Sequence, residues 1–493
     1  MNTIVLIAIV LSAIFYICLG LYYRKGVINL SDIIPVIKGR KAKVNGEDEF
    51  SSSTVATSIS LATVIIAFFE LIPISGLWLF WAVITTALGF WLFSVLSRRI
   101  WTKLSFYDHR PSIHEYISTE FNSKTVGVIA SVSTALGYLC MFAVELIVSS
   151  QFISNFIDIP VWIIITIIAI LSFTYTGLGG FRVVVVSDRI QMWSIWLLLV
   201  SLLLFFSIHI YLNGGISFLS QSVPENVQSL KWSTNLIPFV LGLLIMNLFT
   251  YITNMALWQR VSGTHEEKVF TRGIRKSIFQ SALSWGLFVV IAILAYTVAK
   301  PSVNSKFLVT TLEAVYQFRG GGVVLFFVSL GLFGAMLSTA STQLIAVSHT
   351  IYEDIISKYR KKGLIERIES SKELTLSRVI LVVSALGAIG IVQLLNLIGF
   401  SVADLAFSIY GAALSLAPPI LISLFVNKNI LIQLKYWITL SIIFGFLSAW
   451  FAAFYGVYIL KEPYGNLVFL SPVFGLFVSA FFTLTGYFLK KDV

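Results

Sequence analysis

Long stretches without a charged residue constrain this chain more than any other feature of its sequence. Residues 71–97 contain no Asp, Glu, Lys or Arg, and neither do residues 190–224. About 20 consecutive apolar residues are enough to cross the hydrocarbon core of a bilayer. Only 12% of the 493 residues are charged, whereas soluble proteins have roughly 25% charged residues. The sequence therefore predicts an all-α polytopic membrane protein and excludes a soluble enzyme, a disordered regulator and a nucleic-acid-binding module.

Thirteen apolar segments have the length and composition of transmembrane helices. The first has no basic region before it and is followed by Arg24 and Lys25, so we interpret it as a retained span and not as a signal peptide. Cys18 and Cys140 both lie in apolar segments, which argues against a disulfide framework or a metal site. The predicted spans are 2–23, 53–77, 78–97, 126–152, 159–178, 185–212, 235–257, 277–299, 321–352, 379–397, 401–426, 436–457 and 466–489.

The positions of the basic residues predict how these spans are oriented. If the N-terminus lies outside, 29 of the 34 Lys and Arg residues, Arg260 among them, fall in inner loops or at inner helix ends. Cytoplasmic loops of membrane proteins carry such an excess of Lys and Arg. The pattern predicts a cell-membrane protein with its N-terminus outside and its C-terminus in the cytoplasm, and it explains the net charge of +11 without nucleic acid.

Hydroxyl-bearing residues gather in two of the apolar spans. The second span and its lead-in carry them in dense succession over residues 51–63. The ninth span places Ala335, Ser338 and Thr339 on one helical face, because residues three and four apart lie one above the other. Polar residues within a membrane tend to mark a transport pathway, and such a row of hydroxyls can offer neutral oxygen ligands to a hard cation. Close packing of helices through small residues is the structural alternative.

Two carboxylates also lie within apolar segments. Asp188, just inside the sixth span, either pairs with Arg182 or Arg189 or lies near a cation. Glu145 stands in the middle of the fourth span, where an unpaired carboxylate costs a few kcal/mol. It should therefore face a cavity or bond in protonated form to a neighbouring helix. If it faces a cavity, it favours a solute with an amino or other cationic group, or a role for a proton.

In their order along the chain, these clusters resemble the motifs of the sodium/solute symporter family, which includes the sodium/glucose, sodium/proline and sodium/sialic-acid cotransporters. The resemblance covers nearly the whole chain. The family's Gly-Gly…Thr-Asp…Gln motif is similar to Gly179-Gly180…Ser187-Asp188…Gln191, its Ala-x-x-Ser-Ser pattern to Ala335-Met336-Leu337-Ser338-Thr339, and its Val-Gln-Arg to Trp258-Gln259-Arg260.

The resemblance implies a LeuT-type fold in which two inverted repeats of five helices form the core of one transporter domain over residues 1–493. It also implies that the chain is a transporter and not an enzyme, with alternating access to a midplane site. The expected parts are an extra N-terminal helix (2–23), a first repeat (53–212), a second repeat (235–426) and two C-terminal helices (436–489).

The resemblance further implies where sodium, the coupling ion, binds; no other cofactor is expected. Ala56, Ile59 and Ala335 would offer backbone carbonyl oxygens. Ser338 and Thr339 would offer hydroxyl oxygens, and threonine in place of the family's second serine keeps the ligand. The residues of a possible second sodium site are Asp188, Ser341 and Thr342.

Eight positions resemble substrate contacts of the family, with helix packing as the alternative at each. Where sialic-acid members carry an arginine for the substrate carboxylate, this chain has Glu145, which reverses the charge and favours an amino acid or amine-bearing solute. Sugar is disfavoured because the polar residues of glucose-type members are missing from the third and eighth spans. The candidate substrate-binding residues are Ser58, Ser60, Thr63, Glu145, Asn247, Thr250, Tyr251 and Asn254.

The sequence thus predicts sodium-coupled symport of a small polar organic solute into the cell. The expected partners are the solute, the sodium ion and the lipid bilayer, with no nucleic acid. Two alternatives stay open: a solute sensor that signals through a separate protein docked on the loop 353–378, and proton-coupled symport through Glu145.

Overall fold

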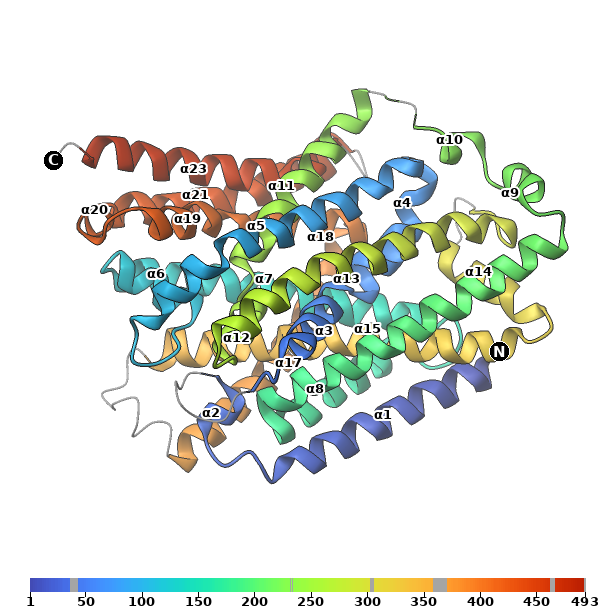
Figure 1. Ribbon diagram of the computed structural model, residues 1–493, viewed down its shortest axis with the longest axis horizontal. Helices are drawn as coiled ribbons and strands as arrows, with labels where there is room; N and C mark the ends of the chain where they lie inside the picture. The colour runs from blue at the N-terminus through green and yellow to red at the C-terminus, as the bar shows by residue number, and fades with distance from the viewer. Residues whose placement is uncertain are drawn as a thin grey trace.

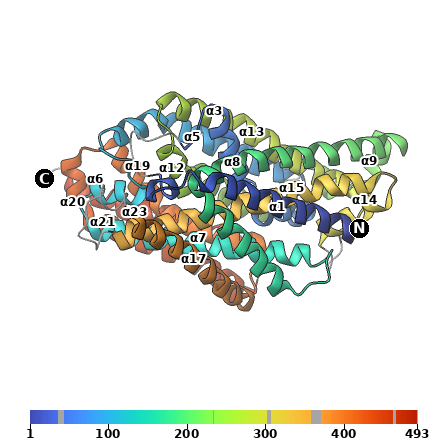
Figure 2. The same cartoon turned by 90° about the horizontal axis from the view of Figure 1, so that it is seen from below.

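In the computed structural model, helices lie side by side along the long axis of the molecule. The structure describes residues 1–35, 43–230, 232, 234–301, 306–357, 370–461 and 466–491, and every regular element in these ranges is a helix. The N-terminus lies towards the end that carries α9 and α14, and the C-terminus lies at the end of α6 and α20 (Figures 1 and 2). The elements are α1 (Asn2–Arg24), α2 (Leu30–Ile33), α3 (Glu47–Ser58), η1 (Leu61–Ile66), α4 (Ala67–Ser75), η2 (Gly76–Leu79), α5 (Phe80–Ser105), α6 (Ile113–Glu120), α7 (Lys124–Ile153), α8 (Val161–Leu212), α9 (Ile216–Ser222), α10 (Glu225–Gln228), η3 (Thr234–Leu236), α11 (Ile237–Thr253), α12 (Met255–Ser262), α13 (Glu267–Leu294), η4 (Ala295–Thr297), α14 (Phe307–Gln317), α15 (Gly321–His349), η5 (Thr350–Ile356), α17 (Ser371–Ile398), α18 (Val402–Ala413), η7 (Leu414–Leu416), α19 (Ala417–Phe425), α20 (Lys428–Gln433), α21 (Lys435–Phe454), η8 (Tyr455–Ile459), α22 (Asn466–Phe469) and α23 (Ser471–Lys490).

Among the described residues, 11 helices are long and apolar enough to cross a membrane. Two of them, Leu61–Ser105 and Val161–Leu212, each contain parts of two predicted spans. The hydrocarbon core is about 30 Å thick, and a helix that rises about 1.5 Å per residue crosses it in roughly 20 residues. A straight helix over Val161–Leu212 would be more than twice as long as the core is thick. The predicted segments all overlap these helices, and their division into thirteen separate spans stays a prediction.

The chain turns within α8 at a single glycine. Gly180 has φ 65° and ψ −161°, a conformation that essentially only glycine adopts. A Cβ atom at this position would lie 2.4 Å from the backbone oxygen of Asp32. The glycine-rich stretch that the sequence places in a tight connection is therefore a bend between two helical limbs, and α2 packs against it.

Two helices break inside the bundle, at the start of each predicted repeat. α3 ends at Ser58, and Ile59 leaves the helical conformation with φ −101° and ψ 82°. α11 ends before Asn254, which has φ −76° and ψ 101°. Each second half begins with a side-chain cap: Ser60 Oγ accepts the N–H of Thr63, and Asn254 Oδ1 accepts the N–H of Leu257. These caps satisfy backbone donors that the break would leave unpaired.

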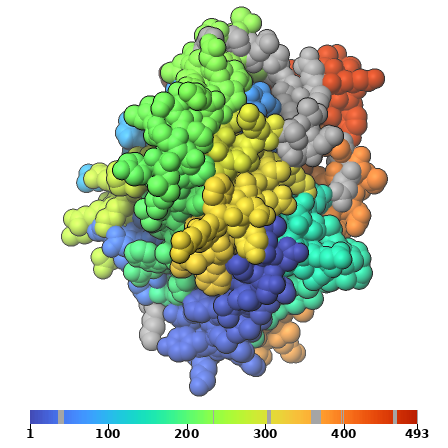
Figure 3. All heavy atoms as spheres, turned by 90° about the vertical axis from the view of Figure 1, so that its right-hand side faces the viewer, coloured from blue at the N-terminus to red at the C-terminus, as the bar shows by residue number. Residues whose placement is uncertain are grey.

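The second half of α15 forms the centre of the bundle. Every residue from Leu332 to His349 is buried, and α15 packs against α1, α3, α7, α8 and η1. At the end of the molecule that carries the N-terminus, the yellow segment around α14 and the start of α15 lies between the green segment around α9 and the blue α1 (Figure 3). The site described below therefore lies among buried helices.

The strained backbone of Gly180 gives a test of this fold. Gly180→Ala should lower the melting temperature of the purified protein by several degrees, because the new methyl group meets Asp32 and the backbone conformation costs on the order of 1–3 kcal/mol. Gly177→Ala is the matched control, since a Cβ there has no atom within 4 Å. Equal melting temperatures for the two variants would contradict the bend.

Candidate functional site

The break between α3 and η1 lies beside α15. Ala56 and Ile59 are fully buried, and both α3 and η1 pack against α15. The carbonyl of Ala56 accepts the N–H of Ile59 at 3.2 Å, which closes the last turn of α3. The last carbonyls of a helix have no partner in the next turn. The structure therefore places the end of α3 next to the hydroxyl-bearing helix.

The three predicted sodium residues of α15 are buried at this contact. Ala335 and Ser338 are completely buried, and Thr339 is 3% exposed. The Ser338 hydroxyl donates to Asp188 Oδ1 at 2.8 Å. The Thr339 Oγ1 atom is buried and has no hydrogen-bond partner among the described residues. Since Thr57 of α3 and Thr339 line one cavity, the structure brings the end of α3 and this face of α15 to the same space.

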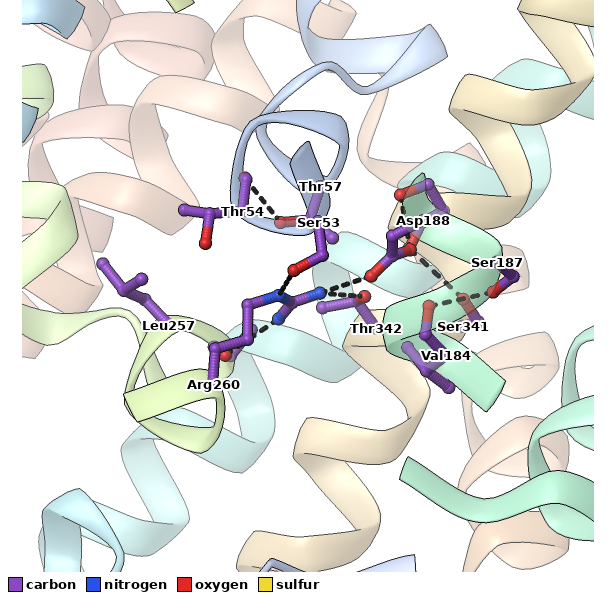
Figure 4. A network of polar contacts seen from close by, with 12 residues as sticks. Ser53, Thr54, Thr57, Val184, Ser187, Asp188, Leu257, Arg260, Ser341 and Thr342 are labelled. Atoms are coloured by element: carbon purple, nitrogen blue, oxygen red, sulfur yellow. Dashed lines mark hydrogen bonds and ion pairs between the residues drawn. The ribbon is translucent and has the colours of Figure 1, made fainter. Parts of the chain in front are cut away.

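A buried ion pair lies next to Ser338. Arg260 of α12 donates from Nη2 to Asp188 Oδ2 of α8 at 2.6 Å and to Thr342 Oγ1 of α15 at 3.1 Å (Figure 4). Its Nε donates to Ser53 Oγ of α3 at 3.2 Å, and its Nη1 to the carbonyl of Ala256 at 2.9 Å. Arg260 is 1% exposed and Asp188 is fully buried. The guanidinium thus connects four helices through charge-assisted hydrogen bonds.

One sequence-based expectation about these charges needs correction. The predicted pairing of Asp188 with Arg182 or Arg189 is wrong: Arg182 donates to Glu49 Oε2 at 2.5 Å, and Arg189 is exposed. Arg260 lies at a helix end as expected, in the last turn of α12, and it is buried there beside Asp188, whose charge it compensates. The Gln-Arg pair after the broken helix was the available signal, and it could have been interpreted as a buried partner.

Glu145 of α7 bonds to the break itself. The Ser60 hydroxyl donates to Glu145 Oε2 at 2.5 Å, and Ser149 lies at the limit of hydrogen bonding, 3.5 Å away. Of the two expectations, the structure contains the bond to a neighbouring helix. That Glu145 makes this bond in protonated form stays a prediction.

A central cavity with about 940 Å³ of space, open solvent included, opens between the two broken helices. Among its described lining residues only Arg260 carries a formal charge. Neither Ser60 nor Glu145 belongs to the lining, because both face the break. The predicted substrate residues that do line the cavity are Ser58, Thr63, Asn247, Thr250, Tyr251 and Asn254.

Comparisons with known proteins agree with this architecture. A family model described as the sodium:solute symporter family matches residues 49–430. The chain belongs to this family. A search of curated proteins finds no match.

Solved structures show that the family member has the LeuT-type fold. A Na⁺-coupled sialic acid symporter in a substrate-bound outward-open state has a TM-score of 0.76 with 18% identity, over 98% of this chain and 97% of that one. The nucleobase-cation-symport-1 family transporter Mhp1 has a TM-score of 0.55 with 13% identity, over 94% and 96% of the two chains. The Eremococcus coleocola manganese transporter has a TM-score of 0.53 with 14% identity, over 94% and 99%.

Two residues that line the cavity of this family member have buried polar atoms that sequence reasoning did not single out as substrate contacts. Trp285 Nε1 of α13 and Thr54 Oγ1 of α3 are buried in residues that line the cavity, and neither has a hydrogen-bond partner among the described residues. An indole N–H is a donor only. A lone tryptophan in an apolar span has the same sequence signature as a packing residue, so only the three-dimensional arrangement distinguishes the two.

The Asp188–Arg260 pair makes a testable contribution to stability. Asp188→Asn should destabilise the protein by about 3–5 kcal/mol, because it leaves the guanidinium buried without its counter-charge. The double variant Asp188→Asn, Arg260→Gln should lose less than the two single variants together, as expected for residues in direct contact. Thermal unfolding of the purified variants measures both effects.

Lys276→Gln is the control, because Lys276 pairs with Glu47 and Asp48 at an exposed position where ion pairs contribute little. A melting temperature for Asp188→Asn as close to wild type as that of Lys276→Gln would refute the structural importance of the buried pair.

Proposed function

We propose that this chain is a sodium-coupled symporter that imports a small polar organic solute across the cell membrane by alternating access. The observation that carries the proposal is the position of α3: its broken end packs against α15, and its residue Thr57 lines both the central cavity and a second cavity shared with Thr339. In transporters with broken helices, unwound carbonyls coordinate the ion and the substrate binds alongside. We place the N-terminus outside and the C-terminus in the cytoplasm, as the basic residues indicate.

The proposed sodium site consists of the carbonyl oxygens of Ala56, Ile59 and Ala335 and the hydroxyl oxygens of Ser338 and Thr339. The buried, unpartnered oxygen of Thr339 supports this assignment, because a buried polar atom without a partner is costly unless something binds it. The bond from Ser338 to Asp188 supports it as well, since the hydrogen points to the carboxylate and the lone pairs stay available for a cation.

The cavity lining favours a solute with hydrogen-bond acceptors. Trp285 offers an N–H group, Thr54 offers a hydroxyl, and Arg260 already has Asp188 as its counter-ion. The preference for an amine-bearing solute depended on a carboxylate in the cavity, and Glu145 bonds to Ser60 outside the lining. We therefore propose a polar solute whose carbonyl, carboxylate or hydroxyl oxygens face Trp285 and Thr54.

The proposed cycle begins with sodium from outside. The ion links the end of α3 to α15 and so orders the first broken helix, whose residues Thr54, Thr57 and Ser58 line the cavity. Solute binding then allows the outer side to close, and low internal sodium releases the ion and afterwards the solute. The membrane potential adds about 2.3 kcal/mol per elementary charge per 100 mV to the sodium gradient.

Uptake by reconstituted protein tests the proposed coupling. Proteoliposomes would be offered labelled amino acids, amines, sugars and carboxylates with and without an inward sodium gradient. We expect at least one solute to accumulate only with the gradient. Accumulation driven by a pH gradient in sodium-free buffer would instead support proton coupling through Glu145. Solute binding without flux would support a sensor; residues 358–369 of its expected docking loop lie outside the described chain.

Thr339 provides a test of the ion site that needs no known solute. Thr339→Ala should raise the sodium concentration for half-maximal thermal stabilisation about tenfold, because a bond to a charged group contributes about 1.5–3 kcal/mol and about 1.4 kcal/mol equals a factor of ten. Thr339→Ser keeps the oxygen and should stay within about twofold of wild type. Titrations in NaCl against choline chloride measure this shift.

Thr311→Ala serves as the control, since Thr311 is equally buried but its hydroxyl donates to the carbonyl of Phe307 on α14. If Thr339→Ala and Thr311→Ala respond to sodium alike, Thr339 is not a ligand.

A further inference from the structure

Two of the three residues expected to hold a second sodium ion, Asp188 and Thr342, have oxygens that already accept hydrogen bonds from Arg260. Asp188 accepts hydrogen bonds on both carboxylate oxygens, from Arg260 on Oδ2 and from Ser338 on Oδ1. Thr342 Oγ1 accepts from the same guanidinium nitrogen. The Ser341 hydroxyl donates to the carbonyl of Leu337 at 2.7 Å. Figure 4 shows the guanidinium directed into the space between Asp188 and Thr342.

Arg260 is surrounded by oxygen atoms, as a bound cation would be. Its three guanidinium nitrogens all donate, to oxygens of α3, α8, α12 and α15. The residue is 1% exposed, and a buried guanidinium requires this number of oxygen partners and a carboxylate beside it. By contrast, Thr339 Oγ1, one turn from Thr342 on the same helix, has no partner among the described residues.

We infer that Arg260 takes the place of the second sodium ion and that the symporter binds one sodium ion per chain. This inference rests on the proposed function, since it assumes that sodium binds at Ser338 and Thr339. Two cations that share one buried carboxylate repel each other strongly, because the bundle interior screens charge poorly. The tethered guanidinium neutralises Asp188 throughout the cycle and needs no ion from solution.

The pair also positions a ligand of the remaining sodium ion. Because Arg260 keeps Asp188 ionised and fixed, Asp188 holds the Ser338 hydroxyl with its hydrogen away from the ion. Arg260 lines the central cavity as well, so one chain of contacts runs from the cavity through Asp188 to Ser338. Asp188 and Arg260 are therefore positioning residues for the sodium site.

Counting bound ions tests the inference. Equilibrium binding of ²²Na⁺ to purified full-length protein gives the number of ions per chain at saturation. We expect one ion for the wild type and two for Arg260→Gln, which leaves Asp188, Ser341 and Thr342 free to bind sodium. The matched control, Thr342→Val with Arg260→Gln, removes a ligand of the second site only and should return the count to one.

A second readout covers the case in which Arg260→Gln is unstable. Sodium in place of choline should raise its melting temperature by more than it raises that of the wild type, because the ion then compensates Asp188. Two ions per wild-type chain, or one ion in folded Arg260→Gln, would overturn the inference and leave sodium coupling intact. No bound sodium in the wild type would overturn the proposed function itself.

Discussion

The proposed ion site depends on how the break between α3 and η1 is stabilised. A break inside a membrane bundle exposes backbone groups that lipid cannot satisfy, and each unsatisfied group costs several kcal/mol. Ser60 satisfies one of these groups, because its hydroxyl oxygen accepts the N–H of Thr63. The same hydroxyl donates to Glu145. Asn254 performs the same role in α12 and also accepts from the hydroxyl of Tyr138 at 3.1 Å. Because both breaks are held by side chains of α7, their carbonyls and the cavity between them keep a defined geometry.

The buried acidic residues near the two breaks also have partners within the protein. Glu145 accepts a hydrogen bond from Ser60, and Arg260 compensates Asp188. Among the described residues that line the cavity, Trp285 and Thr54 have buried polar atoms without a hydrogen-bond partner, and none is acidic. We propose that the solute is recognised by hydrogen bonds.

The sequence predicted those features that depend on neighbouring residues. The hydroxyl face of α15 follows from helical spacing, and the dense hydroxyls over residues 51–63 mark the helix that the structure shows to be broken. The partners of the two buried acids could not be predicted, since Asp188 and Arg260 are 72 residues apart and Ser60 and Glu145 are 85 apart. Periodicity places a residue on a face of its own helix, and only packing decides which helix that face meets.

The central claim is that sodium binds between the end of α3 and the hydroxyl face of α15. Cryo-electron microscopy maps of the protein in sodium chloride and in choline chloride, compared at the same resolution, test it most directly. The account predicts a density that is present only with sodium and lies within coordinating distance of the Ala56 and Ile59 carbonyls and the Ser338 and Thr339 hydroxyls. A sodium-dependent density elsewhere, or identical maps in the two salts, would contradict it.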